Sequence, residues 1–439
     1  MTVGFYAPLP PARTGVADYA AALLAELRKH GRVEVAPSAC DVALYHLGNN
    51  GMHGDIYQRA LEVPGVVVLH DAVLHHFLLG RLGEAAYIAE FVYNYGEWSR
   101  SLAQELWLGR ASSGTGRRYF DYPMLRRIVV RSRAVVVHNP AAARIVQECL
   151  PDGVQALPPA ASRLRTPDLM ELAVTPVLPS VPPFQKPLTE PRPLGSGGPE
   201  ARDRLKPFRS PGAAEKSACA PPVEIPHLFV PPRDLPGGAE AMRWRHRWGV
   251  EPGTFLFGIF GYLRESKRLV TVMETFADLR RNHPRTALLV AGQFVSTGLE
   301  RAVEPMLSHP GVIRRPHLAE REFWLAAQAV DAGINLRYPA AGETSGIAIR
   351  LMGLGKPVMM TESLECSRFP EDACIRIASG AAERDSLREH MRLLAGMPEV
   401  ATAIGERAAA HIRAHHRVDL IGDQYWQLLR GIAQTADRI

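Results

Sequence analysis

The chain has 439 residues, of which 46% are hydrophobic and 22% charged, and its formal net charge is +6. These values are typical of a soluble globular protein with two or three domains. The weak and scattered positive charge suits an anionic small ligand or a lipid surface, and it argues against a nucleic-acid partner.

The cysteines and the first residues predict a cytoplasmic protein. The five cysteines are widely spaced and form no CxxC pair, which favours a reducing compartment over a disulfide framework. The first residues, MTVGFYAPLPPARTG, have no basic head followed by an apolar run, so we expect no signal peptide. No apolar stretch is long enough to span a bilayer.

The first 150 residues alternate strand and helix patterns. A strand is predicted at 2–8, and a helix at 16–31 because its leucines recur at helical spacing. Further apolar runs predict strands buried on both faces at 42–48, 65–71 and 134–139. Residues 1–150 are therefore predicted to form a doubly wound α/β domain.

Residues 151–222 differ in composition from the rest of the chain. Sixteen of the 36 prolines lie there, together with a GSGG run, and no period is visible. We predict a disordered linker or insertion, with a small irregular subdomain as the alternative.

A second doubly wound domain is predicted over residues 223–414. Its strands are predicted at 254–261, 286–292, 331–337 and 356–361. The last segment, 415–439, contains the amphipathic run DLIGDQYWQLLRGIAQ and is predicted to form a helix that packs across the domain junction.

Ligands of open α/β sheets bind beyond the carboxyl ends of the strands, so the residues that follow each strand are the candidates. Gly15 lies between the first strand and the first helix, where an anion could approach the backbone, although a plain turn glycine fits equally well. His70 and Asp71 end a buried strand, and His70 could contact a sugar hydroxyl. His75 and His76 do not share a face with His70, so no metal site is predicted.

The second half offers two more candidates. A basic loop with Arg264, Lys267 and Arg268 follows a strand that ends in glycine, and its cations suit a diphosphate, although a solvated loop is the plainer interpretation. In GETSGIAIRLMGLGKPV, residues 342–358, an apolar stripe predicts a helix. Four residues precede or begin it: Glu343, Thr344, Ser345 and Gly346. Their hydroxyls could simply cap the helix, or the helix start could bind phosphate while the carboxylate accepts sugar hydroxyls.

Together these segments resemble glycosyltransferase family 4. The resemblance rests on NLRYPAAGETSGIAIRLMGLGKPV, and on the order of PLPPARTGVADY, HLGNN, VVVLHD, VVVHN, IPH and GYLRESKRL. It covers both α/β halves and leaves out the proline-rich segment. It implies the GT-B fold, in which two Rossmann-like domains face a central cleft, with the insertion between them.

The resemblance also implies an activity and residue roles. It implies transfer of a sugar, with retention, from a nucleotide-diphosphate sugar to an acceptor in polysaccharide or glycolipid synthesis, without a metal or other cofactor. Glu343 would hold the sugar, Lys267 would neutralise the diphosphate, and His70 would lie by the sugar on the acceptor side. The donor-binding residues would be Gly15, Arg264, Arg268, Thr344, Ser345 and Gly346.

Two positions depart from the family pattern. Leu351 occupies the place of a second glutamate that contacts the ribose, and Tyr262 replaces an arginine after the glycine of the basic loop. Two alternatives therefore stay open: another nucleotide-sugar enzyme such as an epimerase, and a degenerate, non-catalytic GT-B scaffold. No GxGxxG follows a strand, which argues against an NAD-dependent oxidoreductase.

The acceptor is not specified by the sequence, and both a saccharide and a lipid-linked acceptor fit. Residues 110–133 carry seven arginines and one acid, with aromatic residues among them. This stretch could make peripheral contact with the inner face of an anionic membrane, although a solvated basic face explains it as well.

Overall fold

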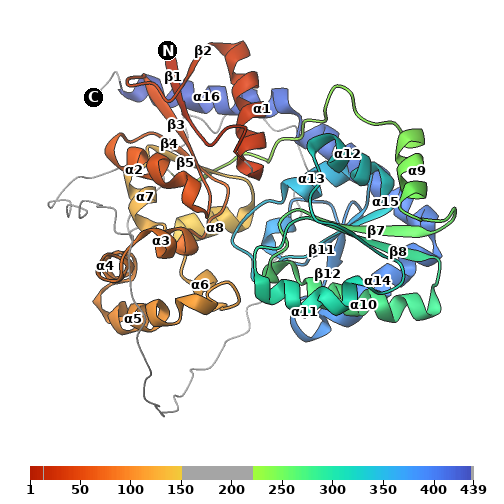
Figure 1. Ribbon diagram of the computed structural model, residues 1–439. Helices are drawn as coiled ribbons and strands as arrows, with labels where there is room; N and C mark the ends of the chain where they lie inside the picture. Colours follow the sequence, from red (N-terminus) through yellow and green to blue (C-terminus); the bar gives the residue numbers. More distant parts are fainter. Residues whose placement is uncertain (13, 151–220, 437–439) are drawn as a thin grey trace, which may run out of the picture. The chain divides into compact units, whose positions relative to one another are not determined.

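The computed structural model describes residues 1–12, 14–150 and 221–436, which are coloured in Figure 1. The proline-rich segment predicted at 151–222 lies outside the described residues except for its last two.

The first half is built on a parallel sheet of six strands in the order β2–β1–β3–β4–β5–β6. The strands are β1 (Thr2–Tyr6), β2 (Arg32–Val35), β3 (Val42–Leu47), β4 (Val66–Leu69), β5 (Ala134–Val137) and β6 (Val223–Glu224). Four of them confirm predicted strands, whereas β2 and β6 were not predicted. Because β6 pairs with β5, the first residues after the proline-rich segment extend the first sheet.

The second half is built on another parallel sheet of six strands, in the order β12–β11–β10–β7–β8–β9. The strands are β7 (Phe255–Phe260), β8 (Thr286–Ala291), β9 (Val312–Arg315), β10 (Ala332–Asn335), β11 (Val358–Thr361) and β12 (Ile375–Ile377). The four predicted strands are confirmed, and the unpredicted β9 and β12 form the two edges. Two doubly wound layers are thus present, as expected.

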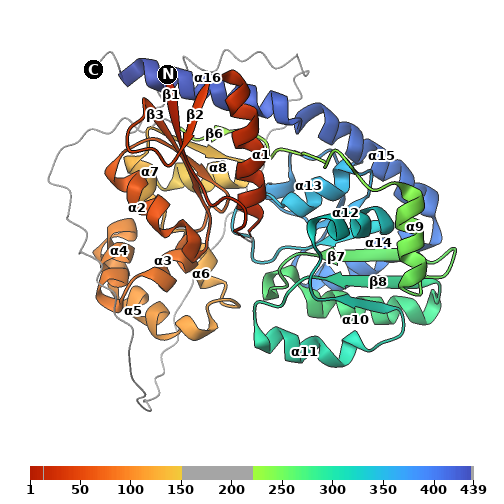
Figure 2. The ribbon, with the colours of Figure 1, turned by 45° about the horizontal axis from the view of Figure 1, so that its top comes forward.

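Helices cover both faces of each sheet (Figures 1 and 2). Those of the first half are α1 (Gly15–His30), α2 (Gly54–Glu62), α3 (His75–Arg81), α4 (Glu84–Tyr95), α5 (Arg100–Leu108), α6 (Arg118–Asp121), α7 (Arg126–Arg131) and α8 (Pro140–Glu148). Those that follow are α9 (Gly238–Arg247), α10 (Leu269–Asn282), α11 (Thr297–Leu307), α12 (Glu320–Ala329), α13 (Gly346–Gly353), α14 (Glu383–Gly396), α15 (Pro398–His415) and α16 (Val418–Ala436).

The last helix, α16, packs on the first half of the chain although it is the most distant in sequence (Figure 2). Its buried side chains Tyr425 and Leu429 join Leu23 and Leu27 of α1 in one apolar core on a face of the first sheet. The hydroxyl groups of Tyr19 and Tyr425 are hydrogen-bonded at 3.0 Å inside this core. The amphipathic pattern at the end of the chain therefore forms a helix whose apolar face covers the first sheet.

The strand order determines where a ligand can approach. In the second sheet the order reverses between β7 and β10, and ligands of doubly wound sheets bind beyond the carboxyl ends of the strands at such a switch point. The loops that leave β7 and β10 carry residues 261–268 and 336–345, which include most of the candidate donor-site residues.

Candidate functional site

The start of α13 is capped by Ser345. The Ser345 hydroxyl accepts a hydrogen bond from the Ala348 N–H at 3.3 Å and donates one to the Asn335 side-chain oxygen at 3.1 Å. Ser345 is therefore the N-cap, and Gly346 is the first residue of the helix.

Thr344 joins the two halves of the chain. Its hydroxyl oxygen accepts a hydrogen bond at 2.9 Å from the side-chain amide of Asn139, which also donates to the Gly342 carbonyl at 2.9 Å. The Asn139 side-chain oxygen in turn caps α8 by accepting from the Ala142 N–H. The Thr344 hydroxyl is therefore engaged in the contact between the two halves, where it also donates to the His138 carbonyl at 3.4 Å.

Glu343 lies in the loop before α13, and both of its oxygens are engaged. Oε1 is 3.1 Å from the Arg337 guanidinium, and Oε2 accepts a hydrogen bond from the Ala341 N–H at 2.7 Å. Burial raises the pKa of Glu343, the cation of Arg337 opposes this, and the nearby Asp71 adds to the rise. The carboxylate is thus held in a fixed orientation with lone pairs left for hydroxyl donors.

Lys267 is buried next to two arginines. Its ammonium group donates to the Phe260 carbonyl, and its side chain is 8% exposed. Burial, Arg337 and Arg264 all hold the pKa of Lys267 well below its ordinary value, and Glu343 opposes them. A buried cation among other cations is favourable only when an anion joins it.

Gly261 provides the turn that brings Lys267 to this place. Its φ is +84°, and a side chain there would meet Ile347 at 2.5 Å and the Lys267 nitrogen at 3.2 Å. A residue with a Cβ would therefore be strained and would displace the lysine.

The two arginines of the basic loop have different surroundings. Arg264 is exposed and interacts electrostatically with Asp71, Lys267 and Arg337. Arg268 is paired with the buried Glu383 of α14 at 2.7 Å. Only Arg264 shares the surroundings of Lys267 and Glu343.

Asp71 comes from the first half, directly after His70 at the end of β4. Its Oδ2 accepts a hydrogen bond from the Asn49 N–H at 2.8 Å. Burial raises the pKa of Asp71, and Arg264 and Arg337 counteract the rise. Arg264, Lys267, Arg337, Glu343 and Asp71 thus form one group, called here the charged cluster.

His70 is buried beside other histidines. One ring nitrogen, Nε2, is 3.0 Å from Nδ1 of His46 on β3, and the ring packs edge-on against Tyr19. Burial and the nearby histidines hold the pKa of His70 well below its ordinary value, so the imidazole is neutral.

Gly15 is the first residue of α1, where Thr14 accepts a hydrogen bond from the Val16 N–H at 3.4 Å. A Cβ at Gly15 would meet nothing within 4 Å. The structure therefore gives no packing reason for glycine here, and no contact among the described residues ties Gly15 to the charged cluster.

Two members of the charged cluster, Arg337 and Asp71, were not among the predicted site residues. Each is the last residue of a predicted strand, 65–71 or 331–337, so the rule used to find the other candidates could have found them. Leu351 is fully buried against Gly333 of β10. Because Glu343 lies in the loop before α13, Glu343 and Leu351 do not share a face of that helix. Leu351 points into the core.

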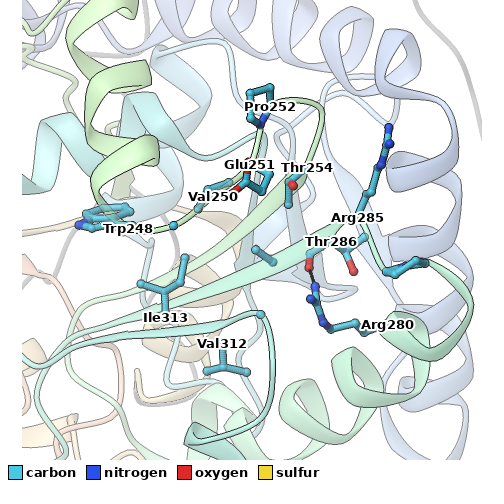
Figure 3. A pocket seen from close by; sticks show the side chains of 14 residues that line it. Trp248, Val250, Glu251, Pro252, Thr254, Arg280, Arg285, Thr286, Val312 and Ile313 are labelled. Atoms are coloured by element: carbon cyan, nitrogen blue, oxygen red, sulfur yellow. Dashed lines mark hydrogen bonds between the residues drawn. The ribbon is translucent and has the colours of Figure 1, made fainter.

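A small pocket opens at the carboxyl ends of β10 and β11. It is lined by Asn335, Arg337, Ala340, Glu343, Thr344, Ser345, Ala348, Met360, Thr361, Ser363, Glu365, Cys366 and Phe369. A larger cavity of about 570 Å³ lies between Trp248 and Arg280, at the amino ends of β7, β8 and β9 (Figure 3). Because it is at the opposite end of the sheet, it is separate from the charged cluster.

Among residues 1–12, 14–150 and 221–436, no three His, Cys, Asp or Glu side chains are arranged to hold a metal ion. In the same residues no helix is both long enough and apolar enough to cross a bilayer.

No protein-family model matches this sequence, and no curated protein resembles it in sequence. Solved structures do match. HepE of Anabaena, in complex with UDP and glucose, aligns with TM-score 0.57 and 11% identity over 98% of this chain and 100% of its own. Sucrose-phosphate synthase of Thermosynechococcus elongatus gives 0.56 and 12% identity over 99% of this chain and 100% of its own.

A third match is WaaG, a glycosyltransferase involved in lipopolysaccharide biosynthesis, with TM-score 0.54 and 12% identity over 98% of this chain and 100% of its own. The chain has the GT-B glycosyltransferase fold. This confirms the fold implied by the sequence resemblance. At such identities the likeness extends to the fold alone, because one GT-B scaffold can carry different donor and acceptor sites.

Proposed function

We propose that this GT-B protein transfers a sugar, with retention, from a nucleotide-diphosphate sugar to an acceptor. The observation that carries the proposal is the charged cluster, in which two arginines, a lysine and two acidic side chains meet at the switch point of the second sheet. A diphosphate is the ligand whose charge suits the surplus of cations, and a sugar is the ligand whose hydroxyls suit the carboxylate of Glu343.

Lys267 and Arg264 are proposed to neutralise the departing diphosphate. Negative charge grows on that group as the bond to the sugar breaks, so fixed cations stabilise the transition state more than the ground state. With these cations in place the reaction needs no metal ion. Arg268 is proposed to contribute less to neutralising the diphosphate, because its pairing with Glu383 turns it toward α14.

Glu343 is proposed to accept hydrogen bonds from the donor sugar, with Arg337 holding its carboxylate in place. The backbone N–H groups at Ser345 and Gly346, at the start of α13, are proposed to contact the diphosphate or ribose, and Gly15 to lie near the diphosphate. His70 is proposed to lie beside the sugar on the acceptor side. The acceptor is a saccharide or a lipid-linked molecule, as in polysaccharide or glycolipid synthesis.

Uridine is the first base to test, since HepE has been solved with UDP and with UDP-glucose. Thermal unfolding of the purified protein is followed with UDP, GDP, ADP and TDP, and again with the double variant Glu343→Ala, Lys267→Ala. We expect one nucleotide to raise the midpoint of the wild type and not of the variant.

Lys29→Ala, at an exposed lysine on α1, is the matched control and should keep the response. If no nucleotide shifts the midpoint of the folded protein, the donor-site proposal fails and the degenerate-scaffold alternative gains weight. If a nucleotide binds, a sugar-transfer assay with its hexose derivatives follows, and the anomeric configuration of the product tests retention.

A further inference from the structure

Two imidazole rings are in contact at the carboxyl edge of the first sheet. His46 is on β3 and His70 follows β4, and His46 Nδ1 is 3.0 Å from His70 Nε2. His46 is fully buried, and His70 is 9% exposed. The contact joins two ring nitrogens, so one of them donates a proton and the other accepts it.

Neighbouring histidines show how protons are placed in this interior. The Nδ1 atoms of His53 and His138 lie 3.0 and 2.9 Å from the carbonyl oxygens of His46 and Ile225. A carbonyl only accepts, so Nδ1 carries the proton in both rings. The Nε2 atoms of both rings are buried without a partner among the described residues, so each carries an unused lone pair.

The same reasoning settles which nitrogen of His46 is protonated. Its Nε2 is also buried without a partner among the described residues. A proton there would leave an N–H donor with no acceptor, which is rarer and more costly than an unused lone pair. The proton is therefore on Nδ1, and His46 donates to His70.

The tautomer of His46 determines the tautomer of His70. If its Nε2 accepts from His46, the proton of the neutral His70 ring is on Nδ1. This nitrogen has no partner in the described part of the chain, yet it is not among the polar atoms closed off from solvent. His70 thus presents an N–H donor to the accessible side of the ring.

We propose that His46 is a positioning residue that fixes His70 as a hydrogen-bond donor to an oxygen of the bound sugar. The inference rests on the proposed function, in which His70 lies beside the sugar, and it excludes His70 as a general base. The groups around the pair are consistent with two neutral rings: Tyr19, His53, His138 and His227 surround it, and Asp71 turns to the Asn49 N–H instead.

The test is ¹⁵N NMR of protein labelled in its histidine rings, with His70→Gln used for assignment. We expect the wild type to show His70 protonated on Nδ1 alone. His46→Phe removes the donor and should let the His70 proton move to Nε2. His46→Asn places an amide N–H near the Nδ1 position and should keep the wild-type pattern, and so should the control His53→Phe.

A His70 proton on Nε2 in the wild type, or an unchanged His70 in folded His46→Phe, would overturn the inference. If His46→Phe does not fold, the wild-type spectrum and His46→Asn still decide it. The spectra need no turnover, so they are read separately from the proposed function. Where a sugar nucleotide binds, His46→Phe should weaken its sugar-dependent affinity about tenfold and His46→Asn should restore it; no difference between these two variants would remove the positioning role.

Discussion

At the scale of single residues, Lys267 has surroundings that are unfavourable for a charged side chain. Burial and two arginines hold its pKa well below the ordinary value of a lysine. A bound diphosphate would bring negative charge to the same place and would raise that pKa. Lys267 should therefore gain a proton when the ligand binds, at any pH between the pKa of the free protein and that of the complex.

This proton uptake can be measured by calorimetry. We expect the binding enthalpy of the nucleotide diphosphate to depend on the ionisation enthalpy of the buffer, and the affinity to weaken as the pH rises. Lys267→Met should abolish the buffer dependence and weaken binding about tenfold or more. Equal enthalpies in two buffers of very different ionisation enthalpy, over the whole pH range, would contradict the prediction.

Only part of the charged cluster was predictable from the sequence. Glu343 and Lys267 stand out because each lies in a loop between a clear strand and a clear helix. Arg264 and Arg268 belong to the same basic loop and look equivalent in the sequence. They differ because Arg268 pairs with Glu383, which lies far along the chain. The proximity of Asp71 to Arg337 depends on how the two sheets meet, which no local pattern contains.

At the scale of elements, the central strands were predicted and the edge strands were not. A strand buried on both faces reads as a continuous apolar run, as in β4 and β8. The edge strands β9 and β12, VIRR and IRI, are short and mixed in polarity because each pairs on one side only. Such segments cannot be told from loops by periodicity alone.

The contribution of α16 to stability can be tested by two leucine substitutions in the same helix. Leu429 is fully buried in the core shared with α1, whereas Leu420 is 39% exposed. Leu429→Ala should lower the free energy of unfolding by about 3 kcal/mol, because it leaves a cavity, and Leu420→Ala by less than about 1 kcal/mol. Urea unfolding measures both, and equal losses would show that α16 does not pack as described.

At the scale of the whole molecule, the interior contains several neutral histidines. Burial lowers the pKa of His46 to about 3 and those of His75, His138 and His416 to about 4. In the unfolded chain these rings titrate near the ordinary value of about 6.5. The unfolded state therefore binds more protons below that pH, and the stability present above pH 6.5 is lost as the pH falls.

We expect this loss to be steep. At pH 5 each of the four rings contributes roughly 2 kcal/mol of destabilisation, and the sum is comparable with the total stability of a typical domain. The free energy of unfolding in urea, measured from pH 8 to pH 5, should fall by several kcal/mol. His309→Gln, at an exposed histidine, should leave the curve unchanged, and a flat wild-type curve would contradict the assignment of neutral buried rings.

The basic stretch at 110–133 is a candidate for contact between the whole molecule and an anionic membrane. Six of its seven arginines are used in internal contacts. Arg127 pairs with Glu90 at 2.6 Å, Arg118 with Glu105 and Arg117 with Asp121, while Arg110, Arg131 and Arg133 donate to the carbonyls of Trp107, Leu61 and Ile432. Two apolar side chains are exposed near its start. Leu108 and Trp98, at or beside the ends of α5, are 77% and 71% exposed, an arrangement suited to the interface of a membrane.

Vesicle co-sedimentation tests this proposed membrane contact. We expect binding to vesicles rich in anionic lipid, loss of most of it in Trp98→Ser, Leu108→Ser, and no loss in Met242→Ser, which changes an exposed side chain on α9. Binding that does not depend on anionic lipid, or that survives the double variant, would remove the proposal.

The return of α16 to the first sheet has a consequence for synthesis on the ribosome. The segment from β7 to α15 is continuous in sequence and can be completed as it emerges. The first half emerges earlier but lacks Tyr425 and Leu429, which close one side of its core, until α16 has been added. The half that is made first is therefore completed after the half that follows it, and until α16 has emerged its uncovered apolar face is open to chaperones and to aggregation.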